Sequence, residues 1–280
     1  MGFVKKTEEK KMVVQEERRK KIEEDIKAAE NRRDNYLCVG IWGSPKTAKT
    51  GIALDLLTEE DIKNGLHVFV WDFDGRAIDV KRNHYENLPN IKVYNPIVRK
   101  ENTLADFKET MKNAIEFHKM AQEYLEKGKL KAVVVDGADK LLTDICETKM
   151  REKHNLDADD VIKAPPYMWG DRNMPYKNFL HKTIMEMDCH RIVVAHSKDK
   201  YSGTPNPVGI EANWHSTTED LFTSTVQMRR ELFKDGARYF GLVEASANSP
   251  ELIGKQFTIL TINKGKITWK GLPAVKEGVL

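Results

Sequence analysis

The chain has 280 residues, enough for one large α/β domain or two smaller ones. Its formal net charge of +3 is too small to indicate a polyanionic partner from bulk electrostatics, so any nucleic-acid surface has to be a local patch. Three cysteines without metal-ligand spacing predict reduced thiols in the cytoplasm, and the sequence lacks the run of about 18 apolar residues that a membrane span needs.

The first predicted element is a charged helical arm over residues 1–34, followed by a single larger domain over residues 35–280. The arm is dense in both signs of charge, and Glu16 precedes Lys20 by one helical turn, in the order that stabilises a helix. It is either a frayed appendage or a docking or oligomerisation arm. Its apolar stripe is thin and consists of Val14, Ile22 and Ile26.

In the larger domain, apolar segments rich in strand formers alternate with segments of helical spacing. Helices are expected at about residues 50–65 and 104–128. Strands separated by helices predict right-handed βαβ units and a mostly parallel central sheet, an α/β fold. The strands are expected at residues 36–42, 67–74, 91–96, 131–139 and 190–198.

Two stretches interrupt this alternation, at residues 151–177 and 199–218. Both are polar and carry prolines, so we expect long loops that are functional or mobile. Near the C-terminus, residues 256–271 alternate around Asn263-Lys264-Gly265, which predicts a β-hairpin.

The stretch GSPKTAKTG is close to the phosphate-binding pattern G-x-x-x-x-G-K-[ST], and it lies between a predicted strand and a predicted helix, as that motif requires. Backbone N–H groups of such a loop point at phosphates, Lys49 can reach the β- and γ-phosphates, and the Thr50 hydroxyl can hold Mg²⁺. Ala48 replaces the second glycine, which matters if the position needs a positive φ. The predicted nucleotide-binding residues are Gly43, Ser44, Pro45, Lys46, Thr47, Ala48, Lys49, Thr50 and Gly51.

A second motif is the strand AVVVD, which is apolar until it ends in Asp136. This is the form of a Walker B strand. Its carboxylate faces the loop across the strand ends, where α/β sheets bind ligands, and would hold Mg²⁺ through a water molecule. The alternative is that Asp136 only caps the following turn.

Together, these motifs resemble the RecA-type P-loop ATPases over roughly residues 36–262. The resemblance implies a RecA-like core that binds ATP and Mg²⁺ and hydrolyses ATP. HVFVWDFDGRAIDV resembles the segment after RecA's second strand, which implies that Asp74 is the water-activating carboxylate, with Asp72 as runner-up. The family usually has Glu there, so the shorter Asp implies slower hydrolysis. Both acids could instead be solvated residues of a turn.

The segment MWGDRNMPYKNFLHKTIMEMDCHRIVVAHSKDKYSG resembles phage and archaeal RecA-like nucleotide-binding proteins, a group that includes single-strand annealing ATPases. This likeness implies the host cytoplasm if a virus encodes the chain. It places His196 where the family has a polar γ-phosphate sensor, although a structural histidine is the alternative. The family also implies a homo-oligomer, a ring or a filament, in which an arginine reaches a neighbour's ATP. The candidates for that arginine are Arg229, Arg230 and Arg238.

Loops at this place line the central channel of RecA-like proteins, so residues 199–218 are expected to be poorly ordered without single-stranded DNA and to contact it. We predict an ATPase that acts on single-stranded DNA in recombination or replication. The alternatives are a motor for DNA packaging or translocation and an ATP-gated binding module with little turnover. The candidate DNA contacts are Lys198, Lys200, Tyr201 and Trp214.

Overall fold

The chain divides into two units, Met1–Asn35 and Tyr36–Leu280. In the first unit, residues 15–24 and 26–27 are helical, and Ile22 and Ile26 are exposed. Val14, the third member of the predicted stripe, lies outside the described residues. The computed structural model describes residues 15–24, 26–27, 36–85, 88–100, 104–161, 163–203 and 205–272.

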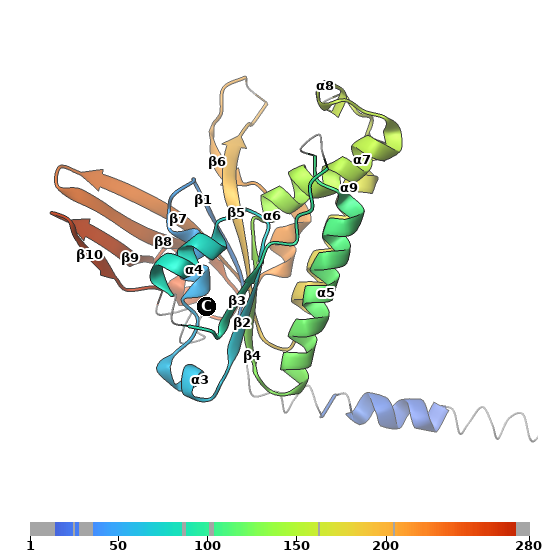
Figure 1. Ribbon diagram of the computed structural model, residues 1–280, viewed down its shortest axis with the longest axis horizontal. Helices are drawn as coiled ribbons and strands as arrows, with labels where there is room; N and C mark the ends of the chain where they lie inside the picture. Colours follow the sequence, from blue (N-terminus) through green and yellow to red (C-terminus); the bar gives the residue numbers. More distant parts are fainter. Residues whose placement is uncertain are drawn as a thin grey trace, which may run out of the picture. The chain divides into compact units, whose positions relative to one another are not determined.

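A ten-stranded sheet forms the centre of the second unit (Figure 1). Its first part is parallel, in the order β3-β2-β4-β5-β1-β7, which confirms the predicted α/β fold with a largely parallel core. The order places β5 between β1 and β4, so the ends of these three strands meet at one edge. The parallel strands are β1 (Cys38–Gly43), β2 (His67–Asp72), β3 (Ile91–Tyr94), β4 (Leu130–Asp136), β5 (His190–Lys200) and β7 (Ser224–Phe233).

Beyond β7, the sheet continues with antiparallel strands. The last two form the predicted C-terminal hairpin, whose turn residues Lys264 and Gly265 have φ angles of +48° and +79°. The sequence predicted the hairpin of the last two strands and did not predict that these strands extend the central sheet. The added strands are β8 (Gly236–Ser246), β9 (Gln256–Asn263) and β10 (Lys266–Trp269).

Helices cover both faces of the parallel part (Figure 1), and alternate residues of each strand supply the two cores. On one face, Phe69 and Trp71 of β2 pack against α5 (Phe107–Glu126). On the other face, Val68 and Val70 share a core with Ile52. The helices of that second face are α2 (Lys49–Leu54), α3 (Glu59–Lys63) and α4 (Ala77–His84). Among the described residues, no helix is both long and apolar enough to cross a membrane.

The prediction of a loop at residues 151–177 is wrong, because most of this stretch is helical. Pro165 and Pro166 lie where a helical turn begins, a position that tolerates proline, and Pro175 lies inside a helix. The predicted helix at 50–65 is in fact two helices, since Thr58 starts α3 with a capping box. The elements from 138 to 185 are α6 (Ala138–Lys140), η1 (Leu141–Cys146), α7 (Glu147–His154), α8 (Ala158–Val161), η2 (Pro166–Met168), α9 (Trp169–Leu180) and η3 (His181–Met185).

The prediction of a loop at residues 199–218 is only partly correct: among its described residues, 201–203, 205–208 and 213–215 have no regular structure, but the others belong to strands or a 3₁₀ helix. Strand β5 runs on to Lys200 and pairs with antiparallel β6 (Gly209–Ala212), and the two strands form an arm that extends beyond the sheet (Figure 1). A 3₁₀ helix, η4 (Ser216–Leu221), follows. The glycines and prolines that predicted disorder lie mostly in the turn between the paired strands.

Candidate functional site

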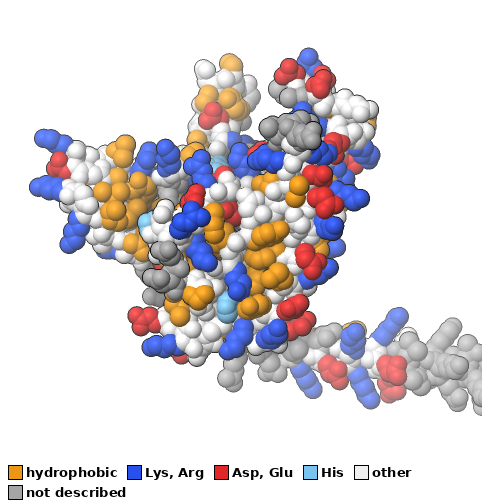
Figure 2. All heavy atoms as spheres, in the orientation of Figure 1, with side chains coloured by type: hydrophobic (Ala, Val, Ile, Leu, Met, Phe, Trp, Pro, Cys, Tyr) orange, Lys and Arg blue, Asp and Glu red, His pale blue; other side chains and the backbone are white. Residues whose placement is uncertain are grey.

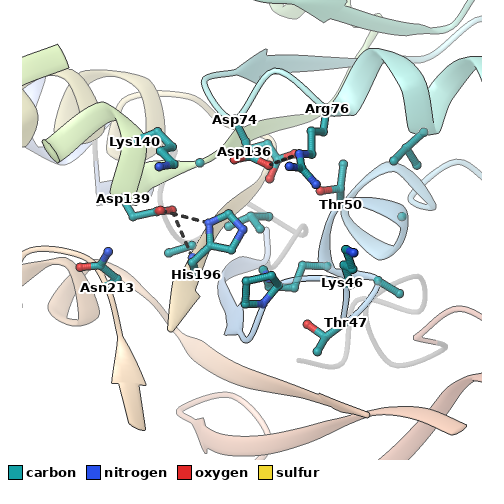
Figure 3. A pocket seen from close by; sticks show the side chains of 18 residues that line it. Lys46, Thr47, Thr50, Asp74, Arg76, Asp136, Asp139, Lys140, His196 and Asn213 are labelled. Carbon is teal, nitrogen blue, oxygen red and sulfur yellow. Dashed lines mark hydrogen bonds and ion pairs between the residues drawn. The ribbon is translucent and has the colours of Figure 1, made fainter. Parts of the chain in front are cut away.

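A cavity of about 510 Å³ lies at the carboxyl ends of β1, β4 and β5 (Figure 3). This is the edge where parallel α/β sheets bind ligands. Residues from five separate segments line it, and they include most of those predicted from the sequence. The lining includes Pro45, Lys46, Thr47, Ala48, Lys49, Thr50, Gly51, Asp74, Arg76, Asp136, Asp139, Lys140 and His196.

The loop after β1 keeps its shape although Ala48 replaces the usual glycine. Ala48 has φ +66° and ψ +18°, a left-handed conformation that favours glycine. The Thr47 hydroxyl donates to the Ser44 carbonyl at 2.8 Å, which closes the loop on itself. A Cβ on Gly51 would lie 3.1 Å from the Trp269 ring, so the slim helical turn after the loop gives room to β10.

Lys49 is held beneath this loop. Its Nζ donates to the carbonyls of Gly43 at 3.0 Å and Ser44 at 2.9 Å, so these two residues position the lysine even though neither lines the cavity. Burial lowers the pKa of Lys49, while the nearby carboxylates, Asp136 foremost, oppose that shift. The ammonium therefore lies close to where a phosphate chain would enter the loop.

Thr50 and Asp136 meet in the cavity, with the Thr50 hydroxyl donating to Asp136 Oδ2 at 2.9 Å. Burial raises the pKa of Asp136 to about 7; the charges of Asp72 and Asp74 add to this rise, while the Thr50 hydrogen bond and Lys49 oppose it. A buried carboxylate among other carboxylates is stabilised by a cation. Because the Asp136 side chain contacts Thr50 of the loop, the geometry favours a ligand site over the predicted alternative of a turn cap.

These oxygens fit Mg²⁺, which prefers carboxylate and hydroxyl ligands and usually retains water and substrate phosphate oxygens. No cluster of three or more His, Cys, Asp or Glu side chains that could hold a metal occurs in the described parts of the chain. Thr50 and Asp136 would thus supply only part of the coordination, and phosphate oxygens and water the rest.

The two acids at the end of β2 have different surroundings. Asp72 is fully buried, and its oxygens accept the backbone N–H groups of residues 75–78 at 2.7–3.4 Å, so it caps the first turn of α4. It does not line the cavity, and we therefore set aside its predicted role as runner-up base. Asp74 does line the cavity, and its carboxylate lies 3.9 Å from Arg76 Nε.

His196 also lines the cavity and is paired with a residue that the sequence analysis missed. Its Nδ1 lies 3.0 Å from Oδ2 of Asp139, and its backbone N–H donates to Oδ1 at 3.1 Å. Arg76 and Lys140, at the cavity, were missed as well. The sequence offered one signal for them: Arg76 closely follows Asp74, and Asp139 and Lys140 closely follow Asp136.

Other predicted residues lie away from this cavity. Of the described residues, the three candidate arginines on β7 and β8 do not contribute to its lining. Arg229 Nε donates to Gln227, whereas Arg238 Nε donates to Thr258 at 3.1 Å. Any role of these arginines in catalysis would therefore be on a neighbouring subunit.

The predicted DNA contacts are divided between the surface and the core. Lys198, Lys200 and Tyr201 are exposed on the arm, and Lys198 Nζ lies 3.4 Å from a carboxylate oxygen of Glu211. Trp214 is only 4% exposed and packs against Phe222, so it cannot stack on a base. On the face seen in Figure 2, the described basic side chains are interspersed with acidic ones.

No protein-family model and no curated protein matches the sequence. Among solved structures, a KaiC-like protein from the hyperthermophilic archaeon Pyrococcus horikoshii is similar, with 13% identity and a TM-score of 0.48 over 84% of this chain and 89% of that one. The RadB recombinase is similar with 15% identity and a TM-score of 0.47, over 82% of this chain and 89% of its own. At these identities, the likeness concerns the backbone fold and not the chemistry of the site.

Proposed function

We propose that this protein is a Mg²⁺-dependent, RecA-like ATPase whose substrate binds in the cavity at the ends of β1, β4 and β5. The observation that carries the proposal is the 2.9 Å hydrogen bond between Thr50 and Asp136, two residues 86 positions apart in the chain, beside the buried ammonium of Lys49. If Asp136 only capped the turn that follows β4, its carboxylate would not need to contact a loop with a phosphate-binding sequence.

Each residue has a definite task in this proposal. The backbone N–H groups of Lys46–Gly51 and the Lys49 ammonium bind the phosphates, and Thr50 and Asp136 hold Mg²⁺. When bound, Mg²⁺ supplies positive charge that neutralises the phosphate oxygens. Asp74 orients the attacking water and accepts its proton. Its carboxylate is one methylene shorter than that of Glu, so we expect slow turnover.

The finer proposal is that this ATPase acts on single-stranded DNA, in recombination or replication, as a homo-oligomer. The β5–β6 arm supports it, because β5 passes from His196 in the cavity to Lys198, Lys200 and Tyr201 on the surface. Lysines beside an exposed aromatic ring suit a single strand, which offers phosphates and unstacked bases. The left-handed Ala48 and the short Asp74 favour the second candidate, an ATP-gated binding module.

ATP binding and turnover test the site. Lys49→Ala should abolish ATP binding measured by calorimetry, while circular dichroism and the control Lys63→Ala, an exposed lysine at the end of α3, remain like the wild type. Unchanged ATP affinity in Lys49→Ala would disprove the site.

Oligonucleotides then separate the candidate roles. Phosphate release should rise with single-stranded DNA, and light scattering should give a mass above that of one chain. Stimulation by duplex DNA with directional movement would indicate the packaging or translocation motor instead. Tight ATP binding without phosphate release would indicate the gated binding module.

A further inference from the structure

A second cavity lies outside the proposed ATP site, between α5 and the helical segment that α9 and η3 form (Figure 1). Its volume is about 290 Å³. One face of α5 bounds it, while another face of the same helix, with Ala114 and Phe117, packs into the core. No part of the proposed ATPase uses this cavity.

The wall of the cavity is mostly apolar. A concave, largely apolar site with a few polar groups is the usual form of a small-molecule site. The helix α9 also passes into the π-helix η3 at this wall, and such departures from α-helical geometry are frequent at functional sites. An apolar body would therefore be transferred favourably from water into this cavity. The apolar side chains of the wall are Phe107, Met111, Ile115, Pro175 and Phe179.

His118 is the polar residue that α5 contributes to the wall. Its Nδ1 is buried and has no hydrogen-bond partner in the part of the chain that the structure describes. Burial lowers the pKa of His118, and the charge of Glu186 opposes that shift only in part, so the ring is neutral at neutral pH. A neutral imidazole carries one N–H, and an N–H at the buried Nδ1 would lack an acceptor. The proton therefore lies on Nε2, which can donate to a ligand.

Lys182 supplies the one fixed charge among the described residues of the lining. Its side chain is exposed, so it lies at the opening of the cavity, and it forms no ion pair with a described residue. The remaining polar residues of the wall, Asn178 and Thr183, are uncharged. An ammonium and a neutral N–H, with no carboxylate beside them in the wall, suit an anion that accepts hydrogen bonds from both.

The volume limits the size of the ligand. A cavity of about 150 Å³ binds benzene, so 290 Å³ holds about twelve non-hydrogen atoms. We propose that this cavity binds an apolar monocarboxylic acid of about that size, whose chain or ring enters between α5 and α9 and whose carboxylate binds Lys182 and His118. The site goes beyond the proposed ATPase and does not depend on it.

Calorimetry with octanoate and 1-octanol tests the proposal, because both ligands are within the size limit and share one apolar chain. Octanoate should bind at one site per chain, about tenfold more tightly than the uncharged alcohol. Lys182→Gln should remove this tenfold advantage and leave 1-octanol within about twofold of the wild type. His118→Phe keeps an aromatic ring without the donor, and should weaken octanoate by about fivefold and not 1-octanol.

Matched variants on α5 locate the site. Lys119→Gln is the control for charge, since this exposed lysine pairs with Glu116 at 2.9 Å and does not line the cavity, and it should bind both ligands normally. Ile115→Trp should block the cavity and abolish binding of both ligands, because Ile115 lines it and is 49% exposed. Met120→Trp, at an exposed position of the same helix outside the lining, should keep both affinities.

The inference would be overturned if octanoate did not bind, bound no better than 1-octanol, or bound normally to Ile115→Trp. An equal loss of both ligands in Lys182→Gln would overturn the assignment of the carboxylate. If Ile115→Trp does not fold, Met111→Trp replaces it. A lower mass of Ile115→Trp in light scattering, without octanoate binding to the wild type, would instead assign the cavity to contacts between copies of the chain. Lys49→Ala should bind octanoate normally, so a failure at either site leaves the other intact.

Discussion

Ala48 has a backbone conformation that L-amino acids rarely adopt. Its φ of +66° is accompanied by a φ of +61° at Lys46, two positions earlier in the same loop. The left-handed conformation costs a residue with a Cβ about 1–2 kcal/mol relative to the right-handed one. The loop therefore keeps the shape that a glycine would give it, at a cost in stability rather than through a change in geometry.

Ala48→Gly should raise the free energy of unfolding by about 0.5–1 kcal/mol. Relief of the left-handed conformation is worth about 1–2 kcal/mol, and the greater freedom of glycine in the unfolded chain removes about 0.4–1 kcal/mol of that gain. ATP affinity should stay within about tenfold of the wild type. Urea denaturation and calorimetry measure the two effects. Ala53→Gly, in the following helix, is the control and should destabilise; a destabilised Ala48→Gly would contradict the argument.

Asp72 and Asp74 should respond differently to the same change. Asp74→Asn should retain ATP binding and lose most of its turnover, because a base acts on the water and not on the bound nucleotide. Asp72→Asn should instead lower the free energy of unfolding by about 1–3 kcal/mol, since four backbone N–H groups lose a charged acceptor. Normal turnover in Asp74→Asn would remove catalysis from this residue.

Among the elements, the β5–β6 arm differs most from the sequence prediction. Composition alone could not reveal it, because the polar residues of β5 and β6 satisfy their backbone groups by pairing with each other. The register Ser197↔Ala212 to Lys200↔Gly209 depends on contacts between strands, which no local pattern in this segment specifies. The same reason explains why residues 151–177 were predicted as a loop. Their helices have little amphipathic pattern and are stabilised by packing against η1 and each other.

The exposed residues of the β5–β6 arm should carry the DNA contact. Replacing Lys198 and Lys200 by Ala should flatten the salt dependence of oligonucleotide binding by up to about two phosphate contacts. Tyr201→Ala should cost about 1–3 kcal/mol if a base stacks there. Fluorescence anisotropy over a range of salt concentrations measures both effects. Replacing Lys266 and Lys270, two exposed lysines near the C-terminal hairpin, provides the control. An unchanged slope in the arm variant would remove the arm from the DNA site.

Trp214 belongs to the core, so its replacement tests stability rather than DNA binding. Its ring packs so close to β1 that a Cβ on Gly40 would lie 2.8 Å from it. Trp214→Ala should lower the free energy of unfolding by about 3–5 kcal/mol. Chemical denaturation measures this loss. A nearly unchanged stability together with weakened oligonucleotide binding would return Trp214 to the DNA site.

At the scale of the whole molecule, the sequence predicted the parts that are local. The loop Gly43–Gly51 and the strand ending in Asp136 are continuous motifs, and the fold brings them together in one cavity. The pairing of Asp139 with His196 joins residues 57 positions apart, and neither has a neighbouring pattern that identifies the other. The joining of the C-terminal hairpin to the rest of the sheet was missed for the same reason, since the hairpin was predicted from its own turn.

The candidate arginines raise a question about assembly, because they do not line the cavity of their own chain, whose described lining includes Arg76. If an arginine from β7 or β8 acts on a neighbour, the interface is heterologous, with the site of one subunit facing the arginine of the next. A subunit that lacks a working site could then still supply its arginine to a neighbour, and a subunit that lacks the arginine could still bind ATP.

Mixing experiments test this arrangement. Lys49→Ala removes the site and keeps the arginines, whereas Arg229→Ala, Arg230→Ala or Arg238→Ala keeps the site. In an equal, randomly exchanged mixture, about one interface in four joins an intact site to an intact arginine, so the correct pair should regain up to about a quarter of the wild-type ATPase rate. Each variant alone, at the same total concentration, is the control. If no mixture exceeds the sum of its parts while Arg76→Ala alone stops turnover, the charge on the terminal phosphate is supplied within one chain.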